Sequence, residues 1–128
     1  MAKQLIQTAA APQPGGPYSQ GLRAGDFIYT AGQVPINPAT GKLAGESIEE
    51  QTEQVLENLR TILEAAGDSL AEVVKTTVHL SDLSLFARFN PVYTRYFPDP
   101  KPVRTTVGSQ LSAGVLVEID VVAYVGEQ

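Results

Sequence analysis

Apolar and polar residues alternate with helical spacing in the middle of the chain. Ser47 and Glu50 have the spacing of a capping box, and apolar positions then return every three or four residues until Gly67. The apolar positions are Ile48, Val55, Leu59, Ile62 and Ala66. The pattern predicts a helix over residues 47–66 that stops at Gly67. Its opposite face carries Glu49, Glu53, Glu57, Arg60 and Glu64, which we interpret as a solvated surface, because outward ligands cannot converge on a metal.

Segments rich in β-branched and aromatic residues predict strands on both sides of this helix. They cover residues 18–23, 27–33, 73–80, 103–109 and 115–125, with a further strand at 3–8. Residues 24–26 predict a hairpin turn, Gly114 predicts a turn before the last strand, and the proline-rich residues 12–17 predict an extended loop. Alternation in the 73–80 strand places Val74, Thr76, Val78 and Leu80 on one face and His79 on the other.

A second helical region opens at Asp82 and carries a stripe of aromatic residues. The stripe consists of Phe86, Phe89, Tyr93, Tyr96 and Phe97. We interpret it as core rather than as a stacking platform. Pro91 interrupts the pattern, so either Asn90 caps a helix that begins at Pro91 or a longer helix is bent there.

This order of elements predicts an α+β fold in which two helices cover one face of a mixed sheet, within a single domain spanning residues 1–128. The last strand has Val117, Ile119 and Val121 on one face, but Leu116, Val122 and Tyr124 make the other face apolar too. A strand that is apolar on both faces needs cover on both faces. We therefore expect a homo-oligomer in which uncovered sheet faces pack together.

Composition narrows the possible chemistry. The chain has no cysteine and one histidine, which excludes thiol catalysis, disulfides and Cys/His zinc sites. Its formal charge of -5 argues against a nucleic-acid partner. There is no apolar run of about 18 residues and no signal-peptide pattern. We therefore expect a cytoplasmic protein without a membrane partner.

Two charged residues stand inside predicted strands. Arg104 lies near the start of its strand, just after the conformationally restricted Lys101-Pro102 segment, and Glu118 interrupts the most apolar strand. Charges in buried strands need a partner or a ligand, and a guanidinium offers a planar fork for a carboxylate. That carboxylate could belong to a ligand, or to Glu118 or Asp120 in a purely structural ion pair. The pattern of residues leaves both readings open.

Seven short motifs occur in an order that resembles the Rid (YjgF) family along nearly the whole chain. They are GPYSQG at 16–21, TAGQVP at 30–35, ENL at 57–59, KTTV at 75–78, FNPVY at 89–93 with YF at 96–97, PVRTTV at 102–107 and VEID at 117–120. The resemblance implies a chorismate-mutase-like α+β fold assembled as a homotrimer. Its sheets would form an inner barrel, and its active sites would lie between subunits.

The resemblance also implies an activity, the hydrolysis of 2-imino acids such as 2-iminobutanoate and 2-iminopropanoate to 2-keto acids and ammonia. These imines arise from the enamines 2-aminocrotonate and 2-aminoacrylate. Arg104 would hold the substrate carboxylate and Glu118 would orient or deprotonate water. Tyr18, Gly32, Asn90 and Thr106 fall at positions that line the family's pocket. No cofactor or metal is expected, because an imine carbon is already electrophilic.

Two departures from the family pattern concern the pocket. Thr106 stands where many members have cysteine, and Ala31 stands where many have serine. A thiol is therefore not essential to this mechanism. The alternative function is a non-catalytic trimeric protein that uses the Arg104 cleft to bind or sense small carboxylates. A nuclease role, attached to some relatives, fits the acidic charge less well.

Overall fold

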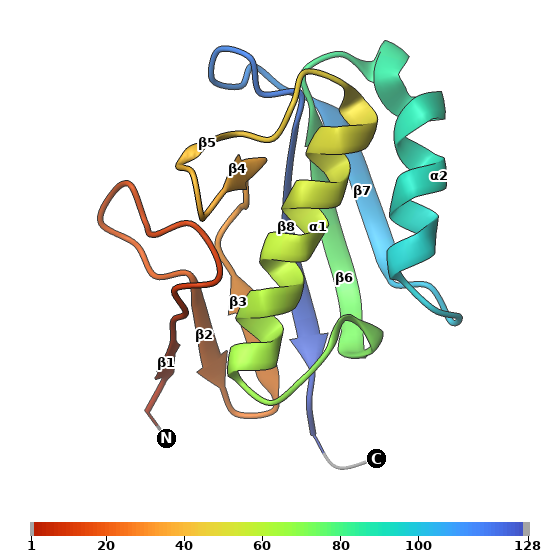
Figure 1. Ribbon diagram of the computed structural model, residues 1–128. Coiled ribbons are helices and arrows are strands. Elements are labelled where there is room, and N and C mark those ends of the chain that lie inside the picture. The colour runs from red at the N-terminus through yellow and green to blue at the C-terminus, as the bar shows by residue number, and fades with distance from the viewer. Residues whose placement is uncertain (1, 127–128) are drawn as a thin grey trace.

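The computed structural model describes residues 2–126, which form two layers, with two helices lying on one face of a six-stranded sheet (Figure 1). The strand order is β1-β2-β3-β8-β6-β7, and only the pair β6 and β7 is parallel. The strands are β1 (Gln4–Ile6), β2 (Gly21–Ala24), β3 (Phe27–Thr30), β6 (Val73–Leu80), β7 (Val103–Gly108) and β8 (Val117–Tyr124). A separate small hairpin pairs β4 (Ile36–Asn37) with β5 (Lys42–Leu43). The predicted α+β class, with both helices on one face, is confirmed.

The helix α1 (Ile48–Ala65) begins and ends where the sequence predicts. The Ser47 hydroxyl accepts a hydrogen bond from the Glu50 backbone at 3.1 Å, and the Glu50 carboxylate accepts one from the Ser47 backbone at 3.4 Å. This reciprocal capping box satisfies donors that have no partner inside the helix. At the other end, Gly67 takes a φ of +83°, which only glycine adopts without strain. The apolar stripe of α1 packs on the sheet and forms much of the core.

Replacing Ser47 with alanine is expected to lower the free energy of unfolding by about 1 kcal/mol, because the N-terminal cap is lost. Urea unfolding at one protein concentration measures this difference. Ser112→Ala is the matched control, since Ser112 is also an exposed serine and its hydroxyl makes no hydrogen bond within residues 2–126. Equal midpoints for Ser47→Ala and the unmodified protein would contradict a stabilising cap.

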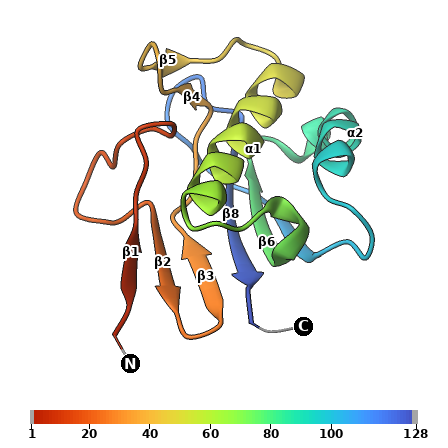
Figure 2. The ribbon, with the colours of Figure 1, turned by 60° about the horizontal axis from the view of Figure 1, so that its bottom comes forward.

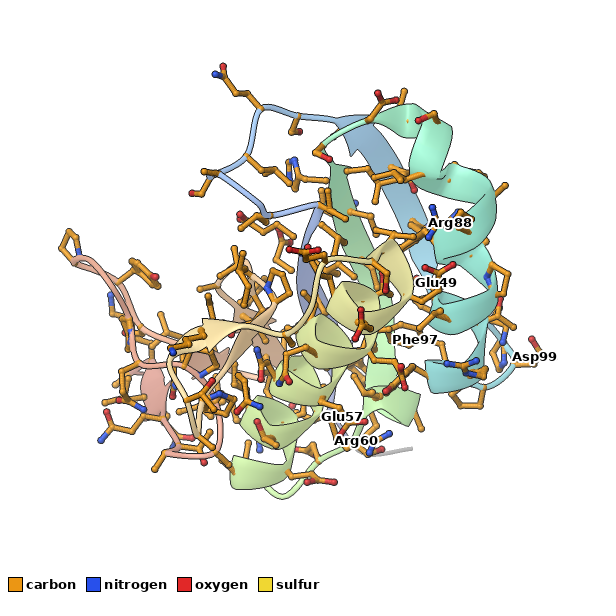
Figure 3. All side chains as sticks on the ribbon, turned by 45° about the horizontal axis from the view of Figure 1, so that its top comes forward. Glu49, Glu57, Arg60, Arg88, Phe97 and Asp99 are labelled. Carbon is orange, nitrogen blue, oxygen red and sulfur yellow. The ribbon has the colours of Figure 1, made fainter. Side chains whose placement is uncertain are left out.

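The sequence predicted a solvated acidic face on α1. In the structure this face also has basic partners, which α2 (Phe86–Tyr96) supplies. Arg88 donates to both carboxylate oxygens of Glu49, at 2.8 and 3.0 Å, and the two side chains point toward each other in Figure 3. Further along, Tyr96 donates to Glu57 at 2.9 Å. Burial and the Glu57 charge raise the pKa of Tyr96 to about 12. These contacts lie along the seam between the two helices.

The second helix passes through its proline. Pro91 lies inside α2, so the longer of the two predicted helices is the one that forms and Asn90 is not an N-cap. The Asp82 carboxylate instead caps a short 3-10 turn, Leu83–Leu85, that leads into α2. The predicted aromatic core is confirmed for Phe89, Tyr93 and Phe97, which are buried, whereas Phe86 remains 40% exposed.

Several strand predictions were wrong in detail. The strand predicted over 27–33 ends at Thr30, and the one predicted over 115–125 covers Val117–Tyr124. Residues 18–20 belong to the loop before β2 rather than to the strand, which starts at Gly21. Val74 is 42% exposed, not buried, because the register between β6 and β8 shifts between Val73 and Lys75. Such a bulge inserts an extra residue and reverses the alternation before it. Beyond the bulge, Thr76, Val78 and Leu80 are buried as predicted.

The two faces of the sheet differ sharply. Both helices lie on the same side, as Figure 2 shows from another direction, and that face carries the buried core residues Ile28, Val78 and Ile119. The other face, called the open face below, bears large apolar side chains that remain partly exposed. Cross-strand pairing places Leu5, Leu22, Tyr29 and Val122 in one row and Phe27 with Tyr124 in the next. No helix within residues 2–126 covers this face.

Candidate functional site

Arg104 lies on the helix-covered face of the sheet, within a group of aromatic rings. On β7 it pairs with Thr76 of β6, which is fully buried under the helices, so both side chains share that face. The guanidinium carbon lies 4.7 Å from the Tyr93 ring centroid, 5.3 Å from that of Phe86 and 5.7 Å from that of Phe89. Aromatic faces attract a cation without neutralising its charge.

No carboxylate pairs with Arg104 in the part of the chain that the structure describes. Tyr93 shares a hydrogen bond of 2.8 Å with the Thr76 hydroxyl, which fixes one wall of the aromatic group. Burial raises the pKa of Tyr93, so its phenol stays neutral beside the guanidinium. The positive charge of Arg104 is therefore held in place and left available to an anion.

Two of the predicted pocket residues lie on the same side as Arg104. Thr106 follows two positions along β7 and pairs with buried Val78, so it shares the face of Arg104. Asn90 sits on α2 between Phe86 and Tyr93 at helical spacing, and its Oδ1 is buried without a hydrogen-bond partner within residues 2–126. Arg104, Thr106 and Asn90 are called the Arg104 half below.

Glu118 lies on the opposite, open face. On β8 it alternates with Val117 and Ile119, both buried under the helices, so its side chain points away from them. The carboxylate lies against Gly32. A Cβ built at Gly32 would collide with Oε2 of Glu118 and lie 3.1 Å from its Cδ. The absence of a side chain at Gly32 thus makes room for this carboxylate.

Tyr18 and Gly32 line a hollow of about 250 Å³. Tyr18 belongs to the loop before β2, is 54% exposed, and its hydroxyl accepts a hydrogen bond from the Gly15 backbone at 3.2 Å. The N–H of Gly32 makes no hydrogen bond within residues 2–126 and remains a free donor beside Glu118. Glu118, Gly32 and Tyr18 are called the Glu118 half below.

The structure therefore divides the predicted site residues into two groups that do not meet within one chain. Strand β6 separates β7 from β8, and Arg104 and Glu118 project from opposite faces. The structural ion pair that the sequence left open, between Arg104 and Glu118 or Asp120, does not form. Asp120 shares the open face with Glu118, where burial raises its pKa against the opposing effects of His79 and Lys75.

The aromatic environment of Arg104 was not predicted as part of the site. Phe86, Phe89 and Tyr93 showed only the helical spacing of a core stripe. Their role depends on the parallel pairing of β6 with β7, which brings Arg104 under α2. One signal in the sequence could have suggested this environment. Arg104 is a basic residue in the strand predicted directly after the aromatic helix.

No helix among residues 2–126 is both long and apolar enough to cross a membrane. Within the same residues, no group of three or more His, Asp or Glu side chains is arranged to hold a metal ion.

Comparison with known proteins assigns the chain to a family. Residues 8–125 match the family described as Endoribonuclease L-PSP. A RutC family protein of Pyrococcus abyssi is 51% identical over 97% of this chain and 98% of its own. Reactive Intermediate Deaminase A of Arabidopsis thaliana, a chloroplastic protein, is 42% identical over 94% of this chain and 65% of its own.

A solved structure agrees with these sequence matches. RidA from an Antarctic Psychrobacter superimposes with a TM-score of 0.90 at 43% identity, covering 94% of this chain and 98% of that one. The chain belongs to the Endoribonuclease L-PSP family, the Rid or YjgF family that its seven motifs predicted.

Proposed function

We propose that this protein hydrolyses 2-imino acids, such as 2-iminobutanoate and 2-iminopropanoate, to 2-keto acids and ammonia. The observation that carries the proposal is Arg104, a guanidinium held by three aromatic rings with no carboxylate partner in the described residues. A planar fork in this state suits a ligand carboxylate. Membership of the Rid family, with a relative named reactive intermediate deaminase, supports the reaction.

In the Arg104 half, the guanidinium binds the substrate carboxylate through two parallel hydrogen bonds. Fixing this end places the neighbouring imine carbon at a defined position, which removes most of the entropy cost of bringing it to a catalytic group. Thr106 and Asn90 lie beside the bound carboxylate. The Oδ1 of Asn90 is buried and has no partner in residues 2–126, so Asn90 contributes to the wall of the site rather than a direct hydrogen bond to the substrate.

In the Glu118 half, the carboxylate orients a water molecule and takes one of its protons as the oxygen attacks the imine carbon. The C=N double bond becomes a single bond, and the nitrogen gains the proton that Glu118 took from the water. The hydroxyl proton of the resulting carbinolamine then passes through Glu118 to the nitrogen, which leaves as ammonia as the C–N bond breaks and the C=O bond of the keto acid forms. The free N–H of Gly32 donates to the substrate, and Tyr18 closes the side of the site.

Because the two halves lie on opposite faces of one sheet, a complete site needs two copies of the chain. The open face supplies a reason for copies to associate, since its apolar rows are exposed in the single chain. We propose a homotrimer in which the Arg104 half of one subunit meets the Glu118 half of the next. A cyclic assembly of this kind repeats the same contact at each interface.

The proposed function is tested by adding the protein to threonine dehydratase and threonine and following the release of 2-ketobutyrate. The protein is expected to speed this release, because it hydrolyses the imine faster than water does. Stabilisation by 2-ketobutyrate in a thermal shift, without faster release, would overturn catalysis and favour the binding protein. Cleavage of RNA with no effect on the imine would favour the nuclease role instead.

Replacing Gly32 with alanine is expected to lower kcat by about tenfold to a hundredfold, because the new Cβ displaces the Glu118 carboxylate. The backbone tolerates alanine, since Gly32 is not among the glycines with a positive φ. Gly15→Ala is the matched control, because a Cβ there meets no atom within 4 Å. The dehydratase assay measures both variants, and an unchanged kcat in Gly32→Ala would contradict the role given to Glu118.

A further inference from the structure

Gln20 is a buried polar residue that the roles above do not explain. Its side chain is 2% exposed. The amide nitrogen donates to the carbonyl oxygens of Pro12 at 2.8 Å and Thr8 at 3.1 Å, with a weaker contact to Ala11 at 3.3 Å. The amide oxygen accepts from the Thr8 backbone at 2.7 Å. One side chain thus ties the loop after β1 to the residue just before β2.

The main chain of Gln20 makes a further hydrogen bond, toward the Glu118 half. Its carbonyl oxygen accepts from the N–H of Ala31 at 2.9 Å, immediately before Gly32. On the other side of Gly32, Gln33 exchanges two backbone hydrogen bonds with Ile119, of 2.8 and 3.2 Å. Gly32 therefore lies between two anchored neighbours, and this fixes the direction of its free N–H.

The segment that carries Tyr18 has few other attachments. The N–H of Tyr18 donates to Gly16 at 2.9 Å, and its hydroxyl accepts from Gly15. Both bonds are local, and no hydrogen bond from residues 14–18 reaches the sheet in the described structure. The position of Tyr18 relative to Gly32 therefore depends on the anchor at Gln20.

We propose that Gln20 is a positioning residue for the proposed reaction, which holds Tyr18 and the Gly32 N–H at the fixed separation that the substrate bridges. The inference rests on the proposed function. Arg104 and Glu118 do not depend on the Gln20 side chain, since the hydrogen-bond partners of that amide are Thr8, Ala11 and Pro12. Loss of the anchor therefore weakens substrate binding more than it slows the chemical step.

Gln51 provides a matched control for the test. It is fully buried, and its amide nitrogen donates to the carbonyl oxygens of Gly45 at 3.1 Å and Gly114 at 2.8 Å. Its amide oxygen accepts from the Leu116 backbone at 2.7 Å. Gln51 thus anchors loops through the same chemistry as Gln20, but it makes no bond to the Tyr18 segment or to Ala31.

The experiment compares Gln20→Met with Gln51→Met, which remove the amide and keep a long unbranched side chain. Both are expected to lower the melting temperature. Only Gln20→Met is expected to raise KM for 2-iminobutanoate, by about tenfold, with kcat within about twofold of the unmodified protein. An equal rise of KM in both variants, or none in Gln20→Met, would overturn the positioning role.

The affinity for 2-ketobutyrate, measured by calorimetry, separates this proposal from the proposed function. If the unmodified protein binds the keto acid without hydrolysing the imine, the proposed function fails. The role of Gln20 is then decided by the affinities of Gln20→Met and Gln51→Met for the keto acid. Weaker binding only in Gln20→Met supports the role, and equal binding by both variants overturns it. An unmodified protein that neither binds nor hydrolyses overturns both proposals.

Discussion

Arg104→Ala is expected to lower kcat/KM for 2-iminobutanoate by at least about a hundredfold, because the substrate loses its charged anchor and its fixed orientation. Arg104→Lys is expected to fall between alanine and arginine, since an ammonium keeps the charge but not the planar fork. The measurement is the rate of 2-ketobutyrate release in the dehydratase assay.

The control for this prediction is Arg95→Ala. Arg95 lies on the same helix as the aromatic rings, but its side chain is 61% exposed and its nearest carboxylate, on Glu53, is 3.9 Å away. This variant is expected to keep full activity. If Arg104→Ala retained more than about half of the activity while remaining folded, the carboxylate would have to be bound elsewhere.

Mixing two inactive variants is expected to restore activity. If each site takes Arg104 from one subunit and Glu118 from its neighbour, refolding Arg104→Ala together with Glu118→Gln creates some intact sites. In a random mixture, the subunit that supplies position 104 has an unmodified Arg104 in about one half of the sites. Its neighbour independently has an unmodified Glu118 in about one half, so about one quarter of the sites are complete. The assay compares the refolded mixture with each variant refolded alone.

The same two variants combined after separate refolding serve as the control, because their subunits have not exchanged at the time of mixing. No recovery in the co-refolded mixture would contradict a site shared between subunits. Size-exclusion chromatography with light scattering gives the number of chains in the active species, and a monomer would contradict the proposed homotrimer.

Local signals in the sequence predicted much of the fold because the responsible residues act over short distances. The capping box of Ser47 and Glu50 and the φ of Gly67 are properties of adjacent residues, so the limits of α1 followed from the chain alone. The exposure of Val74 did not, because a bulge depends on the register of β6 against β8. Pro91 left two possibilities that only the packing of α2 decided.

The candidate site could be proposed from the sequence as a set of residues but not as an arrangement. Arg104 and Glu118 stood out as charges within strands, and the family motifs selected their companions. Whether they could pair depended on β6 lying between β7 and β8, a strand order that no short pattern specifies. The partners of the α1 glutamates were missed for the same reason, since Arg88 lies 39 residues from Glu49 along the chain.

The aromatic setting of Arg104 has a consequence for the response of the protein to pH. An arginine held by a carboxylate loses its partner's charge in acid, whereas the phenylalanine rings do not titrate and the tyrosine phenol is already neutral there. Arginine stays protonated at any physiological pH, and burial raises the pKa of Tyr93 further from neutrality. Under the proposed function, the Arg104 half is therefore expected to bind a carboxylate equally well in mildly acidic and mildly alkaline solution, which leaves acid–base control of the reaction to the Glu118 half and to the imine itself.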